Sequence, residues 1–146
     1  MANEKTLFEL VGGRPCLERV HKIFYDKLFK HSWLGKFFEE IDQKVQEAQQ
    51  TDFMMQPMGG ESIYCGKFPI PAHSHMYITE EMFDLRSQIL RESLKEAGVP
   101  DDLAKRWLEI DSAFKNGIVK KNISDCKPRY KGESLMIIPN PLKKTG

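Results

Sequence analysis

Apolar side chains recur every three or four residues along much of this chain, the spacing that places them on one face of an α-helix. The pattern is clearest in two stripes, formed by Phe83, Leu90, Leu94 and Ala97 and by Leu103, Trp107, Ile110, Phe114 and Ile118. No alternating strand pattern extends beyond a few residues, so we expect an all-α protein. The 146 residues are the length of one domain.

Capping residues and helix breakers predict where the helices begin and end. The expected elements are a short helix capped by Thr6 and stopped at Gly12-Gly13, a helix from Pro15 to about Lys30, a helical turn over 33–38, a helix over 43–58 after Asp42, a helix from Thr79 to Gly98, and a last helix from the joint at 99–102 to Lys121. Because Gly66, Pro69 and Pro71 interrupt residues 61–77, we expect no long regular helix there.

The charge and the cysteine content indicate which kinds of binding partner and which cellular compartment to expect. The 22 basic and 21 acidic residues give a formal charge of +1, so no bulk electrostatic argument favours a nucleic acid or an anionic membrane. Cys16, Cys65 and Cys126 lack the paired spacing of zinc sites or redox dithiols, which is typical of reduced thiols. With no signal-peptide core and no membrane-spanning apolar run, we expect a cytoplasmic protein with a small or neutral partner.

The segment from Ala72 to Thr79 carries the most specific candidate chemistry. It sets His73 a few residues before the helix start at Ile78-Thr79, on a helical background without chelating cysteines. Neutral imidazole is a common haem ligand, and a single proximal histidine leaves the opposite face of the iron open for a gas. Taken alone, the His-x-His pattern of His73 and His75 also fits a solvated polar pair.

Several short motifs occur in the order found in one known family. They are Gly12-Gly13, Phe24-Tyr25, Phe37-Phe38, Gln50, Gly59-Gly60, His73 and Ile78-Thr79. In this order and at these spacings they resemble the truncated haemoglobins, the two-over-two globins, and most of all their group I, over roughly residues 6 to 122. The resemblance implies a helical sandwich around haem b that binds dioxygen. Oxidation of nitric oxide or a peroxidase-like activity, and an electron-donating reductase partner, are further expectations.

The same resemblance implies roles for individual residues. His73, five residues before Ile78, corresponds to the proximal ligand, and Tyr25, Gln46 and Gln50 correspond to the distal donors that stabilise a bound gas. Phe38 would stack on the porphyrin. The remaining apolar walls are expected from Phe24, Phe53, Met54 and Phe83, and the partners of the haem propionates from Lys36, Arg86 and Lys67.

The chain departs from the family where His75, Met76 and Tyr77 replace glycines often found after the proximal histidine. We expect His75 to face solvent, while a second function remains open in which His75 or Met76 fills the sixth iron position of a gas sensor or electron carrier.

The tail supplies a third alternative. We divide the chain into a haem domain over 1–127 and an extended tail over 128–146, whose apolar residues 135–138 either pack on the domain or bind another molecule. In the latter case the protein would be a helical interaction module without a cofactor.

Overall fold

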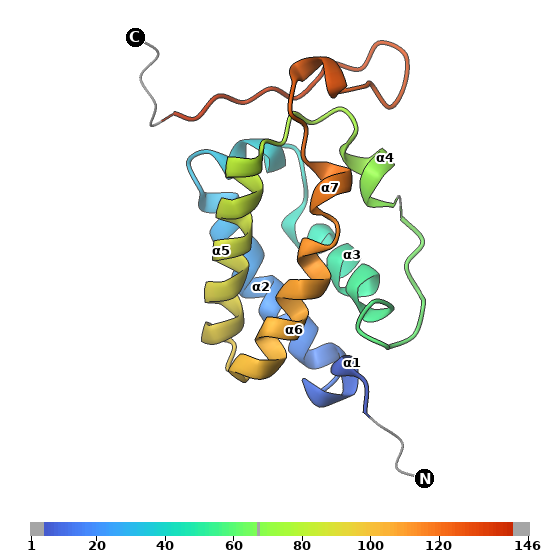
Figure 1. Cartoon of the computed structure of the whole chain (residues 1–146), viewed down its shortest axis with the longest axis vertical. Coiled ribbons are helices and arrows are strands. Elements are labelled where there is room, and N and C mark those ends of the chain that lie inside the picture. The colour runs from blue at the N-terminus through green and yellow to red at the C-terminus, as the bar shows by residue number, and fades with distance from the viewer. Residues whose placement is uncertain (1–4, 67, 142–146) are drawn as a thin grey trace.

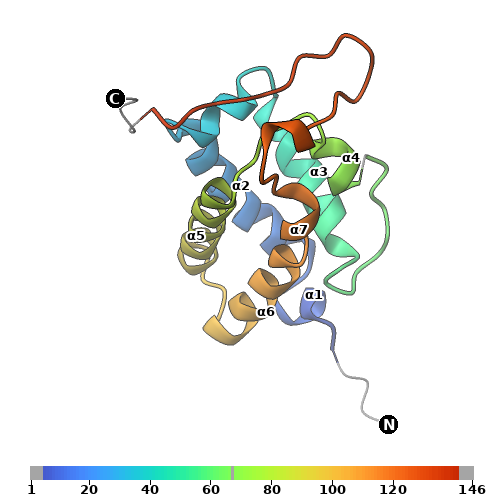
Figure 2. The ribbon, with the colours of Figure 1, turned by 45° about the horizontal axis from the view of Figure 1, so that its top comes forward.

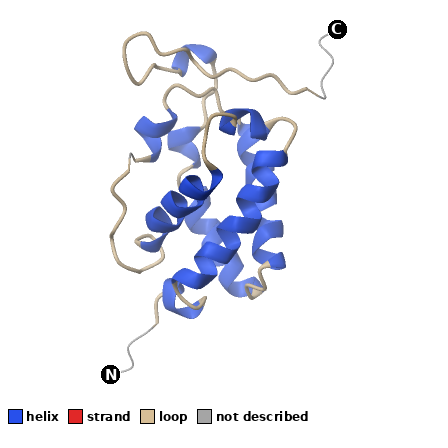
Figure 3. Cartoon of the chain, turned by 180° about the vertical axis from the view of Figure 1, so that it is seen from behind, coloured by secondary structure: helices blue, strands red, loops and turns tan. Residues whose placement is uncertain are grey.

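The computed structural model describes residues 5–66 and 68–141. Its elements are α1 (Leu7–Leu10), α2 (Arg14–Lys30), η1 (Leu34–Phe38), α3 (Gln43–Met55), α4 (Pro69–His73), α5 (Glu80–Glu96), α6 (Asp101–Ser112), α7 (Lys115–Ile118) and η2 (Ile123–Asp125). All regular elements in the described ranges are helices, which confirms the predicted all-α class (Figure 3).

Helix α2 lies at the centre of the packing of the longest helices. Helix α2 packs against α3 and against α5, α5 packs against α6, and α4 packs against α7 (Figure 1). The buried face of α2 carries Leu17, Val20, Phe24 and Leu28, which are all at most 2% exposed. Because these residues recur at three- and four-residue spacing, they form one apolar stripe along the helix, and this stripe packs into the core.

Three predicted helix starts are confirmed by their capping hydrogen bonds. The Thr6 hydroxyl accepts the Glu9 amide and the Glu9 carboxylate reaches back to Thr6, forming the expected capping box. Asp42 accepts the Val45 amide at the start of α3, and Thr79 accepts the Met82 amide at the start of α5. These caps fix the start of α3 and of α5, the helices that lie on either side of α2.

The C-terminal helices differ from the prediction of one continuous helix to Lys121. Helix α6 ends at Ser112, the amides of Ala113 and Phe114 bond the carbonyls of Ile110 and Asp111 three residues back, and the separate helix α7 follows. The break turns Phe114 toward α3, where its ring centroid lies 5.3 Å from that of Phe53. Tertiary packing thus overrides a helical periodicity that is strong in the sequence alone.

Two smaller differences lie around α3 and α4. Helix α3 ends at Met55, three residues early, and turns lead to Gly59, whose φ of +95° suits glycine. The irregular segment 61–77 contains the five-residue helix α4, in which Pro69 and Pro71 lie in the first turn, where no backbone amide is needed. The prolines therefore exclude a long helix, as predicted, and still allow a single turn that ends at His73.

The described part of the tail crosses the end of the molecule that carries α4 and η1 (Figure 2). Met136 pairs with the backbone of Met76 in an isolated parallel bridge: its amide donates to the His75 carbonyl and its carbonyl accepts the Tyr77 amide. The Trp33 indole donates to the Ile138 carbonyl at 2.8 Å. Met136 and Ile138 pack against the core, so this part of the tail lies on the domain.

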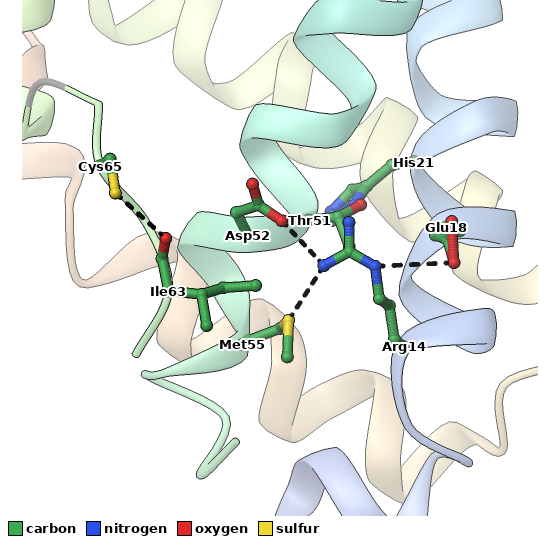
Figure 4. A network of polar contacts seen from close by, with 8 residues as sticks. All are labelled: Arg14, Glu18, His21, Thr51, Asp52, Met55, Ile63 and Cys65. Atoms are coloured by element: carbon green, nitrogen blue, oxygen red, sulfur yellow. Dashed lines mark hydrogen bonds and ion pairs between the residues drawn. The ribbon is translucent and has the colours of Figure 1, made fainter. Parts of the chain in front are cut away.

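Polar side chains connect α2 with α3 (Figure 4). Arg14 forms a 2.8 Å ion pair with Asp52, and the buried His21 ring shares a 2.7 Å hydrogen bond with the Thr51 hydroxyl. Cys16, Cys65 and Cys126 are free thiols. No helix within residues 5–66 and 68–141 is long and apolar enough to cross a membrane.

Candidate functional site

A single cavity of about 860 Å³ collects nearly all of the predicted site residues. This volume is in the range of ligand and cofactor sites. The predicted residues that line it are Tyr25, Lys36, Phe38, Gln46, Gln50, Phe53, Met54, His73, Phe83 and Arg86. Phe24 does not line it: this side chain is buried behind the wall, with its ring centroid 5.0 Å from that of Tyr25. Lys67 lies outside the described residues.

The last residue of α4, His73, presents a ring nitrogen suited to a metal. Its Nδ1 lies 2.7 Å from the Pro69 carbonyl, which can only accept, so Nδ1 carries the proton and Nε2 keeps its lone pair. Burial lowers the pKa of His73 to about 4, with smaller contributions from nearby positive charge, so the ring is neutral at pH 7. A neutral imidazole with a fixed tautomer at an apolar cavity fits the proximal ligand of a haem.

The backbone around His73 is held by Lys120, a residue that sequence analysis did not connect with the site. The ammonium of Lys120 donates to the carbonyls of His73, Met76 and Ile118 at 2.8 to 3.0 Å. These bonds join the end of α4 to the end of α7. A basic residue after a helical stripe carries no signal that it will reach a distant loop, so the sequence could not identify this role.

The expectation that His75 faces solvent is wrong. His75 is 6% exposed and lines the cavity. The tail covers this segment, because the amide of Met136 binds the carbonyl of His75. Burial of His75 thus depends on a contact with a residue 61 positions further along the chain, which local sequence patterns do not reveal.

Tyr25 and Gln46 form a hydrogen-bonded pair on the cavity wall. Tyr25 is buried on α2, and its hydroxyl oxygen accepts a 3.3 Å hydrogen bond from the Gln46 amide on α3. Burial raises the pKa of Tyr25, against the opposing effect of the Arg86 charge, so the phenol remains protonated. Its hydrogen has no acceptor among the described residues and remains available to a ligand in the cavity. Gln50 lines the same cavity one helical turn after Gln46.

Aromatic rings make up much of the remaining wall. Phe38 lies edge-on to Tyr25 at 6.0 Å and stacks on Phe29 at 4.8 Å. Phe53 contacts the rings of Tyr64 and Phe114, two cavity residues that sequence analysis did not single out. Tyr64 belongs to the glycine- and proline-interrupted segment, and Phe114 reaches the cavity only because of the break before α7.

The two basic residues predicted to meet the haem propionates are placed differently. Lys36 is largely exposed at the cavity edge and pairs with Glu39 at 3.3 Å. Arg86 instead lies inside the cavity wall, where it forms a 2.6 Å ion pair with Asp111. The Asp111 side chain is only 6% exposed, and sequence analysis missed it because it lies among the apolar residues of a helical stripe.

Comparison with known proteins gives a consistent result. The family model described as bacterial-like globin matches residues 6–119. A group 1 truncated haemoglobin of Tetrahymena pyriformis is 34% identical over 101 residues, which cover 69% of this chain and 84% of that protein. A group 1 truncated haemoglobin of Synechocystis is 31% identical over 102 residues, covering 67% and 82% of the two chains.

Solved structures show the same similarity. The crystal structure of the ferric truncated haemoglobin of Tetrahymena pyriformis superposes with a TM-score of 0.75 at 29% identity, over 80% of this chain and 100% of that chain. A group II truncated haemoglobin from Bacillus anthracis also superposes with a TM-score of 0.75, over 82% of this chain and 94% of that chain. At 23% identity, the second similarity concerns the fold alone.

Proposed function

Because the chain belongs to the truncated haemoglobins of the bacterial-like globin family, which bind small gas ligands at haem, we propose that it holds haem b through His73 and uses it to bind dioxygen. One observation carries the proposal. His73, with its Nε2 lone pair unused, and Tyr25, with its hydroxyl hydrogen unused, line the same cavity. A metal ligand and a hydrogen-bond donor for the gas are therefore present in one site.

Ferrous haem held in this cavity would supply a binding position for dioxygen. It would also supply the one electron needed to convert nitric oxide and dioxygen to nitrate, and a reductase would then have to return that electron. The chain supplies the surroundings. His73 binds the iron as a neutral imidazole whose orientation is set by Pro69, and the carbonyls around it are held by Lys120. Phe38, Phe53 and Met54 exclude water from the cavity.

The distal donors determine how tightly the gas is held. A gas ligand that gained partial negative charge in this cavity would accept a hydrogen bond from a phenol or an amide. Tyr25 is the first donor, oriented because Gln46 occupies its oxygen, and Gln50 is a second. At about 1 to 2 kcal/mol for each bond, two donors slow the escape of dioxygen more than tenfold. This favours tight binding over rapid delivery.

The proposed oxygen site is tested by Tyr25→Phe in the haem-loaded ferrous protein. Loss of one hydrogen bond of about 1.4 kcal/mol should speed oxygen dissociation about tenfold in stopped-flow measurements. Tyr130→Phe, at an exposed tail position outside the cavity, is the matched control and should leave the rate unchanged. Equal rates for the wild type and Tyr25→Phe would show that the phenol does not contact the ligand.

We also propose that the oxygenated protein oxidises nitric oxide to nitrate and that a reductase returns the iron to the ferrous state. This predicts that one equivalent of nitric oxide, mixed with the oxygenated protein, yields one equivalent of nitrate and leaves ferric haem. A cytoplasmic location is also proposed, on the ground that all three cysteines are free thiols.

A six-coordinate sensor is less well supported. His75 and Met76 line the cavity, but they follow His73 by only two and three residues. Once His73 binds one face of the porphyrin, so short a segment cannot pass around the macrocycle to the other face.

The alternative of a cofactor-free interaction module was suggested by the apolar tail residues 135–138. Two of the apolar tail residues, Met136 and Ile138, pack against the core of the domain.

A further inference from the structure

An arginine lies where a haem cavity would otherwise be expected to be apolar. Arg86 projects from α5 and lines the cavity, with 26% of its side chain exposed. Its guanidinium carbon lies 5.1 Å from the ring centroid of Phe24 and 5.6 Å from that of Phe83. The Arg86 cation thus lies at an aromatic wall, which favours a positive charge by the cation–π interaction.

Asp111 holds this cation in place and leaves most of its donors available. The single hydrogen bond that Arg86 forms within the described residues is the 2.6 Å bond from Nη1 to Asp111. A guanidinium has five N–H donors, so four remain for another acceptor. The ion pair fixes the orientation of the guanidinium without occupying it, as bidentate anion recognition requires.

The position of the charge relates Arg86 to the residues proposed to hold the gas. Phe24, over which the guanidinium stacks, is the chain neighbour of Tyr25 and packs edge-on against its ring. The charge of Arg86 also opposes the rise in the pKa of Tyr25 that burial causes. Arg86 therefore lies close to the proposed distal donor, Tyr25.

Other charged side chains at the cavity are less suited to this role. Lys36 is largely exposed and paired with Glu39, and Arg129 is held by the Glu133 carboxylate. An ion pair such as that of Arg86 and Asp111, with a buried carboxylate and a partly exposed guanidinium, often contributes no more stability than apolar residues of the same size. Its presence at the cavity is therefore better explained by recognition of a ligand than by stability.

We propose that Arg86, positioned by Asp111, is an anion-selecting residue of this cavity, so that the haem-loaded ferric protein binds small monoanions such as azide or nitrite beside Tyr25. The inference rests on the proposed function, because the anion needs the iron as its second partner. It differs from the expectation that Arg86 meets a haem propionate, and the two roles predict different measurements.

Azide is the probe for the test, and imidazole is the neutral ligand for comparison. Both are titrated into the ferric, haem-loaded protein at pH 7 and constant ionic strength, and binding is followed by the Soret absorption. Arg86→Met should weaken azide binding at least about tenfold and change imidazole binding less than about threefold, because it removes a charge-assisted hydrogen bond. Arg86→Lys should restore part of the azide affinity. Arg91→Met, a loss of the same charge on the exposed side of α5, should leave azide binding unchanged.

Removal of Arg86 alone leaves Asp111 buried without its partner, so the double variant Arg86→Met/Asp111→Leu keeps the test valid if the single variant does not fold. It should show the same selective loss of azide binding. Unchanged azide affinity in the folded variant would overturn the inference, and so would an equal loss of azide and imidazole binding. Faster haem transfer to apomyoglobin with unchanged azide affinity would overturn it in favour of the propionate role.

Failure of the proposed function gives a different result. In that case the wild-type protein would not retain one haem per chain, and no titration of the iron would be possible. A wild type that retains haem and releases oxygen faster on Tyr25→Phe, yet binds azide equally well with and without Arg86, would refute this inference alone.

Discussion

The buried His21 should make the protein lose stability in mild acid. Its ring is 1% exposed, bonds the Thr51 hydroxyl at 2.7 Å and lies edge-on to Trp107. Burial, assisted by the nearby charge of Arg86, lowers the pKa of His21 from 6.5 to about 3. The native state therefore keeps this ring neutral at pH values where the unfolded chain protonates it.

The direction and size of the effect follow from the two pKa values. Above pH 6.5 both states hold a neutral His21, and its contribution to stability is complete; as the pH falls toward 3, only the unfolded state takes up the proton, and stability is lost. The loss is about 1.4 kcal/mol for each pH unit below 6.5. Between pH 7.5 and pH 5.0 it amounts to about 2 kcal/mol.

The assay compares the wild type with His21→Gln, whose amide does not titrate. Urea unfolding gives the free energy of unfolding of each protein at pH 7.5 and 5.0, both in the same haem-loaded form. Contributions from the other histidines are common to both proteins and cancel. The stability advantage of the wild type over His21→Gln should shrink by about 2 kcal/mol at pH 5.0. Parallel pH dependences in the two proteins would refute the assignment of a neutral, acid-resistant His21.

Two further predictions concern the contacts that hold the cavity together. Trp33→Phe removes the hydrogen bond from the indole to the Ile138 carbonyl. It should therefore lower the free energy of unfolding by about 1 kcal/mol and speed proteolysis of the tail. An unchanged cleavage rate would mean that this bond does not hold the tail. Lys120→Met leaves the carbonyls of His73, Met76 and Ile118 without their shared donor. It should therefore lower the free energy of unfolding by about 2 kcal/mol and speed haem transfer to apomyoglobin. Equal transfer rates would show that Lys120 does not help to orient His73.

Much of the fold was accessible from the sequence because it depends on local signals. The stripe on α5 and the caps at Thr6, Asp42 and Thr79 each involve residues a few positions apart, and the structure confirms them. The break between α6 and α7 was missed because it follows from packing of Phe114 on the distant Phe53. Periodicity within one segment cannot report such a contact.

The site shows the same division between local and distant information. A family resemblance in short motifs was enough to name ten residues that line one cavity. The burial of His75 and the pairing of Arg86 with Asp111 were not accessible, because each needs a partner on another element. The position of Phe24 behind the wall also depends on the direction of its side chain, which residue type does not determine.

The central claim is that Nε2 of His73 binds the iron of a haem in this cavity. The most direct measurement is the haem content per chain, from the absorption spectrum after reconstitution, of the wild type, His73→Ala and His75→Ala. The wild type and His75→Ala should each retain one haem per chain, while His73→Ala should retain little, because the Pro69 carbonyl fixes the tautomer of His73 for ligation. Full haem retention by His73→Ala, with loss in His75→Ala, would contradict the account and assign the iron to His75.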